Sequence, residues 1–226
     1  MRWTHEHDEL RRTARRIVDE EINPNVDEWE EAGQFPAHHV MKLLGDAGLI
    51  GISRPTDYGG LDLDYSYEVA CAEEMGGIHA YGISTSIGVQ SNMCVPALSK
   101  YGSSELCGEW LTPTFAGDLV GCIGVSEVGS GSDVANVKSS ARRDGDDWVI
   151  NGQKMWISNA GFANIFIVFA RIEDDKNITG FIVPNDPNNG IKLGNEEITR
   201  DIPNVGEDTS VSYTHLRAHE TSLQLV

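Results

Sequence analysis

Apolar residues in the first half of the chain recur every three or four positions, as they do on the buried face of a helix. The predicted helices cover residues 6–22, a segment opened by Pro36, residues 65–75, residues 78–101, and a last segment capped by Ser103 or Ser104 that ends near Leu111. Pro24 is expected to close the first helix, and Pro113 lies beyond the last. Residues 53–63 are rich in turn-forming residues and predict a connection between helices.

The second half changes to the two-residue alternation and short apolar runs that are typical of strands. The predicted strands cover residues 120–125, 138–142, 148–150, 153–157, 165–170 and 179–183. Turns are expected at residues 144–147 and 174–175, and Asn151-Gly152 is a strong signal for a hairpin turn.

This change of period divides the 226 residues into two parts near residues 113–118. We therefore expect an α+β protein with an all-α domain over residues 1–115 and a β domain over residues 116–210. A hydrophobic content of 40% is enough for packed cores and argues against a disordered chain.

The formal net charge is −18, and acidic residues are spread over both halves. No cluster of Lys and Arg is large enough to bind nucleic acid or an anionic membrane, so neither is an expected partner. Four widely spaced cysteines without a C-x-x-C pattern predict reduced, mostly buried thiols. The sequence contains neither a membrane-spanning apolar run nor a secretory signal, and we expect a cytoplasmic protein.

Charged and titratable residues near the N-terminus have a simple structural explanation. Four arginines between residues 11 and 16 lie among acidic residues, which organelle-targeting helices avoid, so we expect a solvated helix face. His5, His7 and the His38-His39 pair are expected to be exposed. Two histidines at 215 and 219 have no evident third ligand, and no metal site is predicted.

Residues 124–133 stand out because three glycines and three serines fall within ten positions. Bare backbone N–H groups and short hydroxyls in such a loop can approach a phosphate or a flat polar ring. Val134 stands where a dinucleotide-binding G-x-G-x-x-G needs its third glycine, and strands follow, so a βαβ nucleotide site is rejected. Val128 likewise breaks the G-x-S-x-G of a nucleophile elbow. A plain glycine-rich connection between strands remains the alternative.

A second segment, residues 151–161, has the sequence N-G-Q-K-M-W-I-S-N-A-G. Trp156 and Ser158 are two residues apart on a predicted strand, so their side chains are expected on one face. An indole beside a hydroxyl can stack on a planar heterocycle and hydrogen-bond to it. The alternative is that Trp156 belongs to the core.

Together the two segments resemble the acyl-CoA dehydrogenase family. Residues 126–133, S-E-V-G-S-G-S-D, are similar to the family's T-E-P-x-A-G-S-D loop, and residues 151–160 to its N-G-x-K-x-W-I-[ST]-N-[AG] strand pair. The G-L-I-G-I at residues 48–52, followed by Pro55 and the Y-G-G at 58–60, is similar to the family's N-terminal helical domain. The resemblance implies a helical domain followed by a partial, β-barrel-like middle domain.

The resemblance also implies an FAD site, with backbone groups from residues 123–132 lining the flavin and its diphosphate. The implied cofactor-binding residues are Ile123, Val125, Ser126, Gly131, Ser132, Trp156, Ile157 and Ser158. The Ser126 hydroxyl would meet the pyrimidine edge of the ring, Trp156 would pack against the ring, and Ser158 would hydrogen-bond near N5. Ser132 would also bind substrate, at the point where the flavin phosphate and acyl-CoA meet. A donor near N5 stabilises negative charge on reduced flavin.

The sequence departs from the family pattern at several points. Ser126 replaces the commoner Thr and keeps the hydroxyl, whereas Val128 replaces the usual Pro and leaves the loop less pre-organised. Ser130 replaces a small apolar residue. Residues 211–226 resemble no part of the family, and we expect them to be foreign sequence introduced during cloning or assembly.

No catalytic residue is assigned within the chain. The family continues with the rest of the β domain and a C-terminal four-helix domain, which supplies the catalytic Glu, so the general base is expected beyond residue 226. Glu127 belongs to the loop motif and is expected to be structural. We expect these residues alone to be inactive.

The implied reaction is α,β-dehydrogenation of acyl-CoA thioesters, with hydride transfer to flavin N5 and electrons passed to a separate flavoprotein. The whole protein is expected to be a homo-oligomer, a tetramer or a dimer. One alternative is a flavin oxidase or monooxygenase on the same fold. Another, for these residues alone, is a non-catalytic module that binds flavin or acyl-CoA. The acyl chain length is left open, although residues 78–101 are expected to form half of the acyl pocket.

Overall fold

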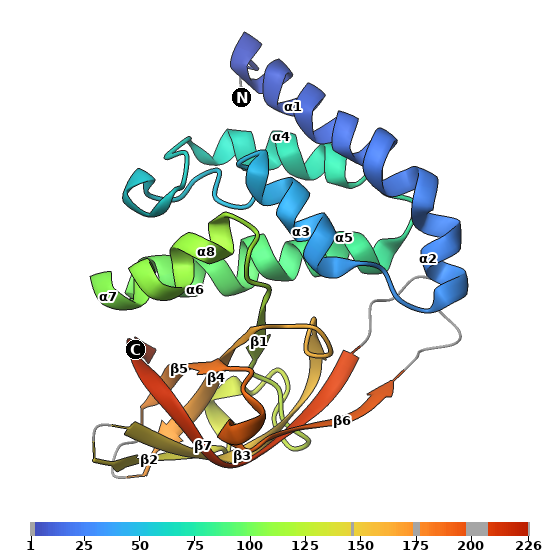
Figure 1. Ribbon diagram of the computed structural model, residues 1–226. Helices are drawn as coiled ribbons and strands as arrows, with labels where there is room; N and C mark the ends of the chain where they lie inside the picture. Colours follow the sequence, from blue (N-terminus) through green and yellow to red (C-terminus); the bar gives the residue numbers. More distant parts are fainter. Residues whose placement is uncertain (1–2, 146, 174–176, 198–207, 226) are drawn as a thin grey trace.

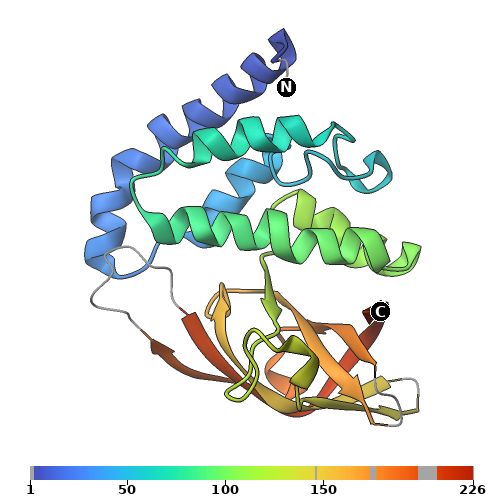
Figure 2. The same cartoon turned by 180° about the vertical axis from the view of Figure 1, so that it is seen from behind.

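The computed structural model describes residues 3–145, 147–173, 177–197 and 208–225, with side chains for most residues up to 193. Helices fill the first half of the chain and strands the second, so the predicted α+β fold class is confirmed. Figures 1 and 2 show the helices as a layer stacked on a curled sheet, with α5 and α6 next to the strands and α1 farthest from them.

Eight α-helices make up the described part of the helical layer. They are α1 (His5–Ile17), α2 (Val26–Ala32), α3 (Ala37–Asp46), α4 (Tyr65–Met75), α5 (Tyr81–Gly88), α6 (Val95–Tyr101), α7 (Ser104–Leu106) and α8 (Thr112–Phe115). Ser103 caps α7 as predicted, because its hydroxyl accepts a hydrogen bond from the Leu106 N–H at 3.3 Å. The connection predicted at residues 53–63 is irregular apart from one short turn at Thr56–Tyr58.

Three prolines lie inside helical rods rather than at their ends, so the stops predicted at Pro24 and before Pro113 were wrong. Segments with π-helical bonding end two residues before Pro24, Pro96 and Pro113. These segments are Val18–Ile22, Val89–Cys94 and Cys107–Leu111. A proline in a regular α-helix collides with the carbonyl four residues back, and the wider π turn makes room for its ring. The chain therefore continues as helix beyond each proline.

His7 is buried, so its predicted exposure was wrong, whereas His5, His38 and His39 are exposed as predicted. The His7 side chain is 3% exposed. Its Nε2 lies 2.7 Å from Ser66 Oγ, and its ring stacks on that of Tyr67 at 3.7 Å between centroids. These contacts connect the start of α1 with the start of α4.

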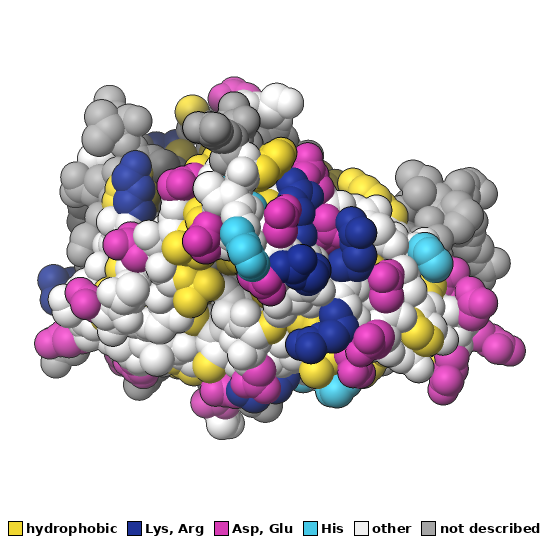
Figure 3. All heavy atoms as spheres, turned by 90° about the horizontal axis from the view of Figure 1, so that it is seen from above, with side chains coloured by type: hydrophobic (Ala, Val, Ile, Leu, Met, Phe, Trp, Pro, Cys, Tyr) yellow, Lys and Arg dark blue, Asp and Glu magenta, His cyan; other side chains and the backbone are white. Residues whose placement is uncertain are grey.

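The arginine face of α1 is only partly solvated. Arg11 and Arg15 donate to the Glu74 carboxylate of α4, at 3.1 and 2.7 Å, so these two residues join the helices instead of facing solvent alone. Figure 3 shows this face of the molecule, on which basic and acidic side chains are interspersed.

The described sheet has seven strands. They are β1 (Gly121–Gly124), β2 (Ser140–Asp144), β3 (Asp147–Ser158), β4 (Ile165–Ile172), β5 (Ile178–Pro184), β6 (Ile191–Glu197) and β7 (Asp208–Leu225). Hydrogen bonds run from β4 through β2, β3, β7 and β5 and back to β4, so the sheet closes on itself as the barrel-like prediction implied. The backbone of β7 pairs with three strands, and whether residues 211–226 are foreign sequence stays a prediction.

The hairpin turn predicted at Asn151-Gly152 was wrong, because β3 runs straight through it as one strand of 12 residues. The turn lies instead between β2 and β3, where Asp144 pairs with Asp147 as the 144–147 prediction required. Gly152 sits at a register shift, and a Cβ there would collide with Ser139 Oγ, so the glycine serves a close approach. The turn predicted at 174–175 lies outside the described residues.

The strand β4 is apolar from Ile165 to Ala170, where both of its faces are buried. Phe166 and Val168 pack inside the barrel with Phe181 of β5. Ile167 and Phe169 alternate with them and pack into the core of the helical layer. The continuous apolar run that predicted a buried strand thus reflects two cores that share one strand.

Two buried amides fix the helical layer on the barrel. Gln90, which is fully buried, donates to the Leu119 carbonyl at 2.9 Å and accepts from the Gly121 N–H at 2.7 Å. Asn159 donates to the carbonyls of Ser86 at 3.1 Å and Gly121 at 3.3 Å. Because each amide bonds to backbone groups of defined position, these contacts fix how the helices sit on the barrel.

The four cysteines are free and buried, as predicted. Burial raises the pKa of the Cys71 and Cys94 thiols to about 12, which keeps them protonated and unreactive. Within the described residues, no helix is both long and apolar enough to cross a membrane.

We expect Gly121→Ala to destabilise the chain by about 1–3 kcal/mol through overpacking. A Cβ at this position would collide with the buried Sγ of Cys94, whereas one at Gly129 would meet nothing within 4 Å. Urea unfolding of both variants measures the difference. Adding Cys94→Ala to Gly121→Ala should recover part of the loss, and an unchanged loss would show that the collision is not its cause.

Candidate functional site

The glycine- and serine-rich loop leaves β1 and turns back tightly. The Glu127 N–H donates to the Ser130 carbonyl at 2.9 Å, and the Ser130 N–H donates to the Glu127 carbonyl at 3.0 Å. The Ser130 hydroxyl donates to the Asp133 carbonyl at 2.6 Å, so this serine is used within the loop. Val128 lies at the tip and is 75% exposed. The loop is thus closed by its own hydrogen bonds despite the absence of the family's proline.

A buried ion pair holds the loop against β3. The Nζ of Lys154, a side chain with no exposed surface, lies 2.8 Å from Oε1 of Glu127 and 3.0 Å from the Val125 carbonyl. The Glu127 carboxylate also accepts from the N–H and hydroxyl of Ser139, at 3.0 and 2.6 Å, and from the Lys138 N–H at 2.6 Å. One carboxylate therefore connects the loop with β3 and with residues 138–139, which lead into β2.

The electrostatics of this pair agree with the structural role predicted for Glu127. Burial raises the pKa of Glu127, but the hydrogen bonds from Lys154, Ser139 and the backbone outweigh burial and hold it at about 2. Burial lowers the pKa of Lys154, and the carboxylate opposes that shift. A carboxylate that holds these donors and ionises at such low pH is a poor general base at neutral pH.

Trp156 adopts an unusual backbone conformation beside the loop. Its φ is 60°, that of Asn159 is 72°, and the pairing of β3 with β7 shifts register between Lys154 and Ile157. A positive φ is a true outlier for a bulky residue and costs on the order of 1–3 kcal/mol. The indole is nevertheless 52% exposed, so assignment of Trp156 to the core was wrong. The simple alternation that placed Trp156 and Ser158 on one face is interrupted here.

The structure brings most of the predicted site residues together. The Met155 N–H donates to the Ser126 carbonyl at 3.0 Å, which places Ser126 directly beside the strand that carries Trp156. Val125 is joined to that strand by Lys154. Ile157 is only 1% exposed and belongs to the barrel core, so the structure does not present its side chain to a ligand.

The remaining predicted residues lie at the margins of this junction. Ile123 on β1 and Ser158 at the end of β3 are half-buried. Gly131 and Ser132 are exposed, beyond the tight turn, and no hydrogen bond recorded among the described residues joins them to β3. A ligand that touches all of these residues would therefore have to extend from Trp156 along the loop.

Sequence reasoning missed three residues that organise the site: Lys154, Gln90 and Asn159. A lysine in the middle of an otherwise apolar strand pattern was the available signal for the first. Nothing local marked the two amides, because their partners are backbone groups more than 20 residues away. Their importance follows only from the packing of helices on the barrel.

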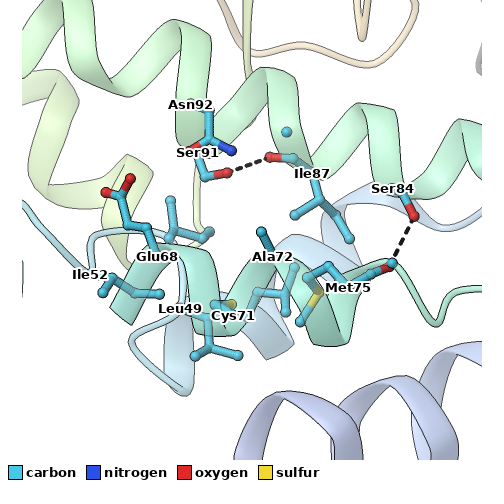
Figure 4. Close-up of a pocket in the computed structure, with 14 residues that line it drawn as sticks. Leu49, Ile52, Glu68, Cys71, Ala72, Met75, Ser84, Ile87, Ser91 and Asn92 are labelled. Atoms are coloured by element: carbon cyan, nitrogen blue, oxygen red, sulfur yellow. Dashed lines mark hydrogen bonds between the residues drawn. The ribbon is translucent and has the colours of Figure 1, made fainter. Parts of the chain in front are cut away.

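A cavity of about 220 Å³ lies within the helical layer, between α4, α5 and the segment that follows α3. Its lining, part of which Figure 4 labels, consists of Leu44, Leu49, Ile50, Ile52, Glu68, Cys71, Ala72, Met75, Gly76, Ser84, Ile87, Gly88, Ser91 and Asn92. The segment 78–101, predicted to form a pocket wall, supplies several of these residues. The cavity is mostly apolar, as is usual for sites that bind hydrocarbon groups.

The junction of loop and strand has the properties that a flat heterocycle with an attached diphosphate requires. It offers an exposed indole, the hydroxyl of Ser126, and bare backbone at Gly129 and Gly131 with open space around both glycines. The described residues contain no group of three His, Cys, Asp or Glu side chains that could hold a metal ion. The exposed indole, the hydroxyl and the bare backbone fit an organic cofactor.

Comparisons with known proteins agree with this geometry. The family model "Acyl-CoA dehydrogenase, N-terminal domain" matches residues 4–118, and the model "Acyl-CoA dehydrogenase, middle domain" matches residues 122–212. The short-chain specific acyl-CoA dehydrogenase of Rattus norvegicus mitochondria is 36% identical over 195 residues. That match covers 84% of this chain and 46% of the relative, so the chain spans about half the length of the curated relatives it matches.

Two solved structures extend the comparison to the fold. A glutaryl-CoA dehydrogenase from Mycobacterium smegmatis in complex with FADH2 superimposes with a TM-score of 0.87 at 29% identity, covering 98% of this chain and 57% of its own. An acyl-CoA dehydrogenase from Bacillus anthracis complexed with FAD gives 0.88 at 26% identity, covering 98% and 38%. Because several relatives are named as mitochondrial, a cytoplasmic location for this chain stays a prediction.

The Glu127 carboxylate should make stability depend on acid pH. Its pKa lies below the usual value of 4.5, so its contribution is present above about pH 4.5 and is lost as pH falls towards 2. Glu127→Gln should remove this dependence, whereas Asp133→Asn, an exposed change in the same loop, should keep it. Urea unfolding between pH 2.5 and 7 measures the effect. Parallel curves for the parent and Glu127→Gln would contradict the assignment.

Lys154→Met should cost about 3–5 kcal/mol at neutral pH, because it leaves the buried carboxylate without its cation. The double variant Glu127→Gln/Lys154→Met should lose less than the sum of the two single changes. A double-mutant cycle from urea unfolding gives the coupling energy. Additive losses would show that the two side chains act independently.

Proposed function

Because the chain belongs to the acyl-CoA dehydrogenase family, we propose that it binds FAD where residues 123–132 meet residues 154–158 and serves the α,β-dehydrogenation of acyl-CoA thioesters. The observation that carries the proposal is the exposed, strained Trp156 held beside Ser126. Strain of this kind persists where the surroundings enforce it, and it is common at functional sites. An apolar ring that is 52% exposed is suited to covering a flat ligand.

Each residue of the site has a role in the proposal. The Ser126 hydroxyl binds the pyrimidine edge of the flavin, Trp156 packs against its ring, and Ser158 donates a hydrogen bond near N5. Backbone groups from Ile123 to Ser132 line the ring and the diphosphate. When bound, FAD supplies the acceptor for the hydride removed from the thioester. The ion pair of Glu127 acts only by holding the loop in place.

Removal of the α-proton requires a base, which we propose lies outside residues 1–226. Glu127 is unsuited because its pKa is about 2 and its oxygens already accept four hydrogen bonds. The chain spans about half the length of its curated relatives, so the activity of the whole protein is part of this proposal.

The cavity in the helical layer is the proposed site for the acyl group. Its apolar lining matches a hydrocarbon chain, and Ser132 is proposed to contact the substrate nearer the flavin. The relatives are named for short-chain and for glutaryl groups, which leaves open whether the acyl group is neutral or carries a second carboxylate. An electron-accepting flavoprotein and assembly into a homo-oligomer complete the proposal for the whole protein.

Titration of the chain with FAD, followed by quenching of flavin fluorescence, tests the cofactor site. Trp156→Ala is expected to weaken binding by about tenfold, since stacking on an aromatic ring contributes on the order of 1–1.5 kcal/mol. Trp156→Phe should retain most of the affinity, and Trp29→Phe, in α2, should leave it unchanged. Equal affinity for the parent and Trp156→Ala would exclude Trp156 from the site.

Anaerobic addition of butyryl-CoA to the FAD-loaded product of the whole gene tests the reaction. Loss of flavin absorbance is expected, because the hydride passes to the ring. Rapid return of the absorbance with O₂ alone would favour an oxidase instead. Failure of both proteins to bind FAD would overturn the proposal.

A further inference from the structure

The cavity in the helical layer has an uneven charge pattern. Of its lining side chains, Glu68 alone is charged, and no Lys, Arg or His contributes to the described lining. The Glu68 side chain is 14% exposed, so its carboxylate is largely shielded from water. Figure 4 shows Glu68, Ser91 and Asn92 at one end of the cavity, with Cys71, Met75 and Ile87 along the rest.

The nearest cation is already engaged by this carboxylate. Oε1 of Glu68 accepts from Nη2 of Arg54 at 3.3 Å and from the Ser53 hydroxyl, and Arg54 is not part of the lining. No donor to Oε2 is recorded among the described residues. The guanidinium therefore contacts one oxygen of Glu68 from outside the cavity and is not presented to a ligand inside it.

The neutral polar groups of the lining offer little to an anion. The Ser84 hydroxyl donates to the Met75 carbonyl at 3.1 Å, and the Ser91 hydroxyl donates to the Ile87 carbonyl at 2.9 Å. Both protons are thus used within the helices, as the dashed lines in Figure 4 show. Asn92 is left as the main neutral side-chain donor of the described lining, beside the weakly donating thiol of Cys71.

We infer that this cavity selects acyl groups without a second carboxylate, and that Glu68 is the residue that determines this selectivity. An anion placed in the cavity would lose its hydration, meet a carboxylate of the same sign and find no cation within the described lining to pair with. A neutral hydrocarbon group meets none of these costs and gains from the apolar lining. The inference rests on the proposed acyl-CoA function and narrows its substrate class.

Methyl NMR of the methionine-labelled chain tests the inference inside the cavity itself. Met75 lines the cavity, and its resonance can be assigned with Met75→Leu. The FAD-supplemented chain is titrated with butyryl-CoA and with glutaryl-CoA. Glutaryl-CoA should bind at least about tenfold more weakly, because like charges in a desolvated site are strongly disfavoured.

Two variants should remove or reverse this preference by independent means. Glu68→Gln removes the charge, frees Arg54 and should bring the affinities within about threefold of each other. Ala72→Lys places a cation on the exposed side of the lining and should favour glutaryl-CoA even if Glu68→Gln folds poorly. Glu73→Gln changes a carboxylate of the same helix that is 55% exposed and outside the lining, and it should alter nothing.

The outcomes separate this inference from the proposed function. Equal binding of the two thioesters to the parent chain would overturn the selectivity and leave the acyl-CoA function standing. A preference unchanged by Glu68→Gln, or removed equally by Glu73→Gln, would overturn the role of Glu68. Failure of both thioesters to shift Met75 would overturn the acyl-CoA site and this inference with it.

Discussion

The buried pair of Glu127 and Lys154 is the interaction on which the candidate site depends. A charged lysine without exposed surface is costly to bury, and it is compensated here by a carboxylate at 2.8 Å and by the Val125 carbonyl. The carboxylate in turn holds the backbone of residues 138–139. The start of the glycine-rich loop is therefore fixed to the strand that presents Trp156 and to the segment that leads into β2.

A second constraint is the junction between the two layers. The rod formed by α5 and α6 faces the cavity with Ser84, Ile87 and Ser91 and faces the barrel with Ser86 and Gln90. One rod thus contributes to the wall of the proposed acyl site and positions β1, from which the proposed flavin loop begins. Movement of this rod would disturb both sites, which explains why buried amides as well as apolar contacts hold it in place.

Several elements could be predicted because their signals are local. The helical and strand periods, the Ser103 cap and the 144–147 turn depend on neighbouring residues, and the structure confirms them. The prediction of a turn at Asn151-Gly152 was wrong because a glycine also allows two segments to pack closely. Here Gly152 lies against Ser139, where a Cβ atom would not fit. The predicted helix ends at Pro24 and before Pro113 were wrong because π turns accommodate these prolines. The spacing of apolar residues does not reveal such turns.

The sequence by itself determined the two-part architecture, the loop and strand motifs and the family to which they belong, because these are properties of residue type and order. Only the tertiary structure decided that Lys154 pairs with Glu127, that Trp156 is exposed on a strained backbone, and that Glu68 is the charged group of an otherwise neutral cavity. These facts depend on which distant segments pack together and on how much water the packing removes. The strength of a charge interaction depends on this environment, because the removal of water lowers the local dielectric constant.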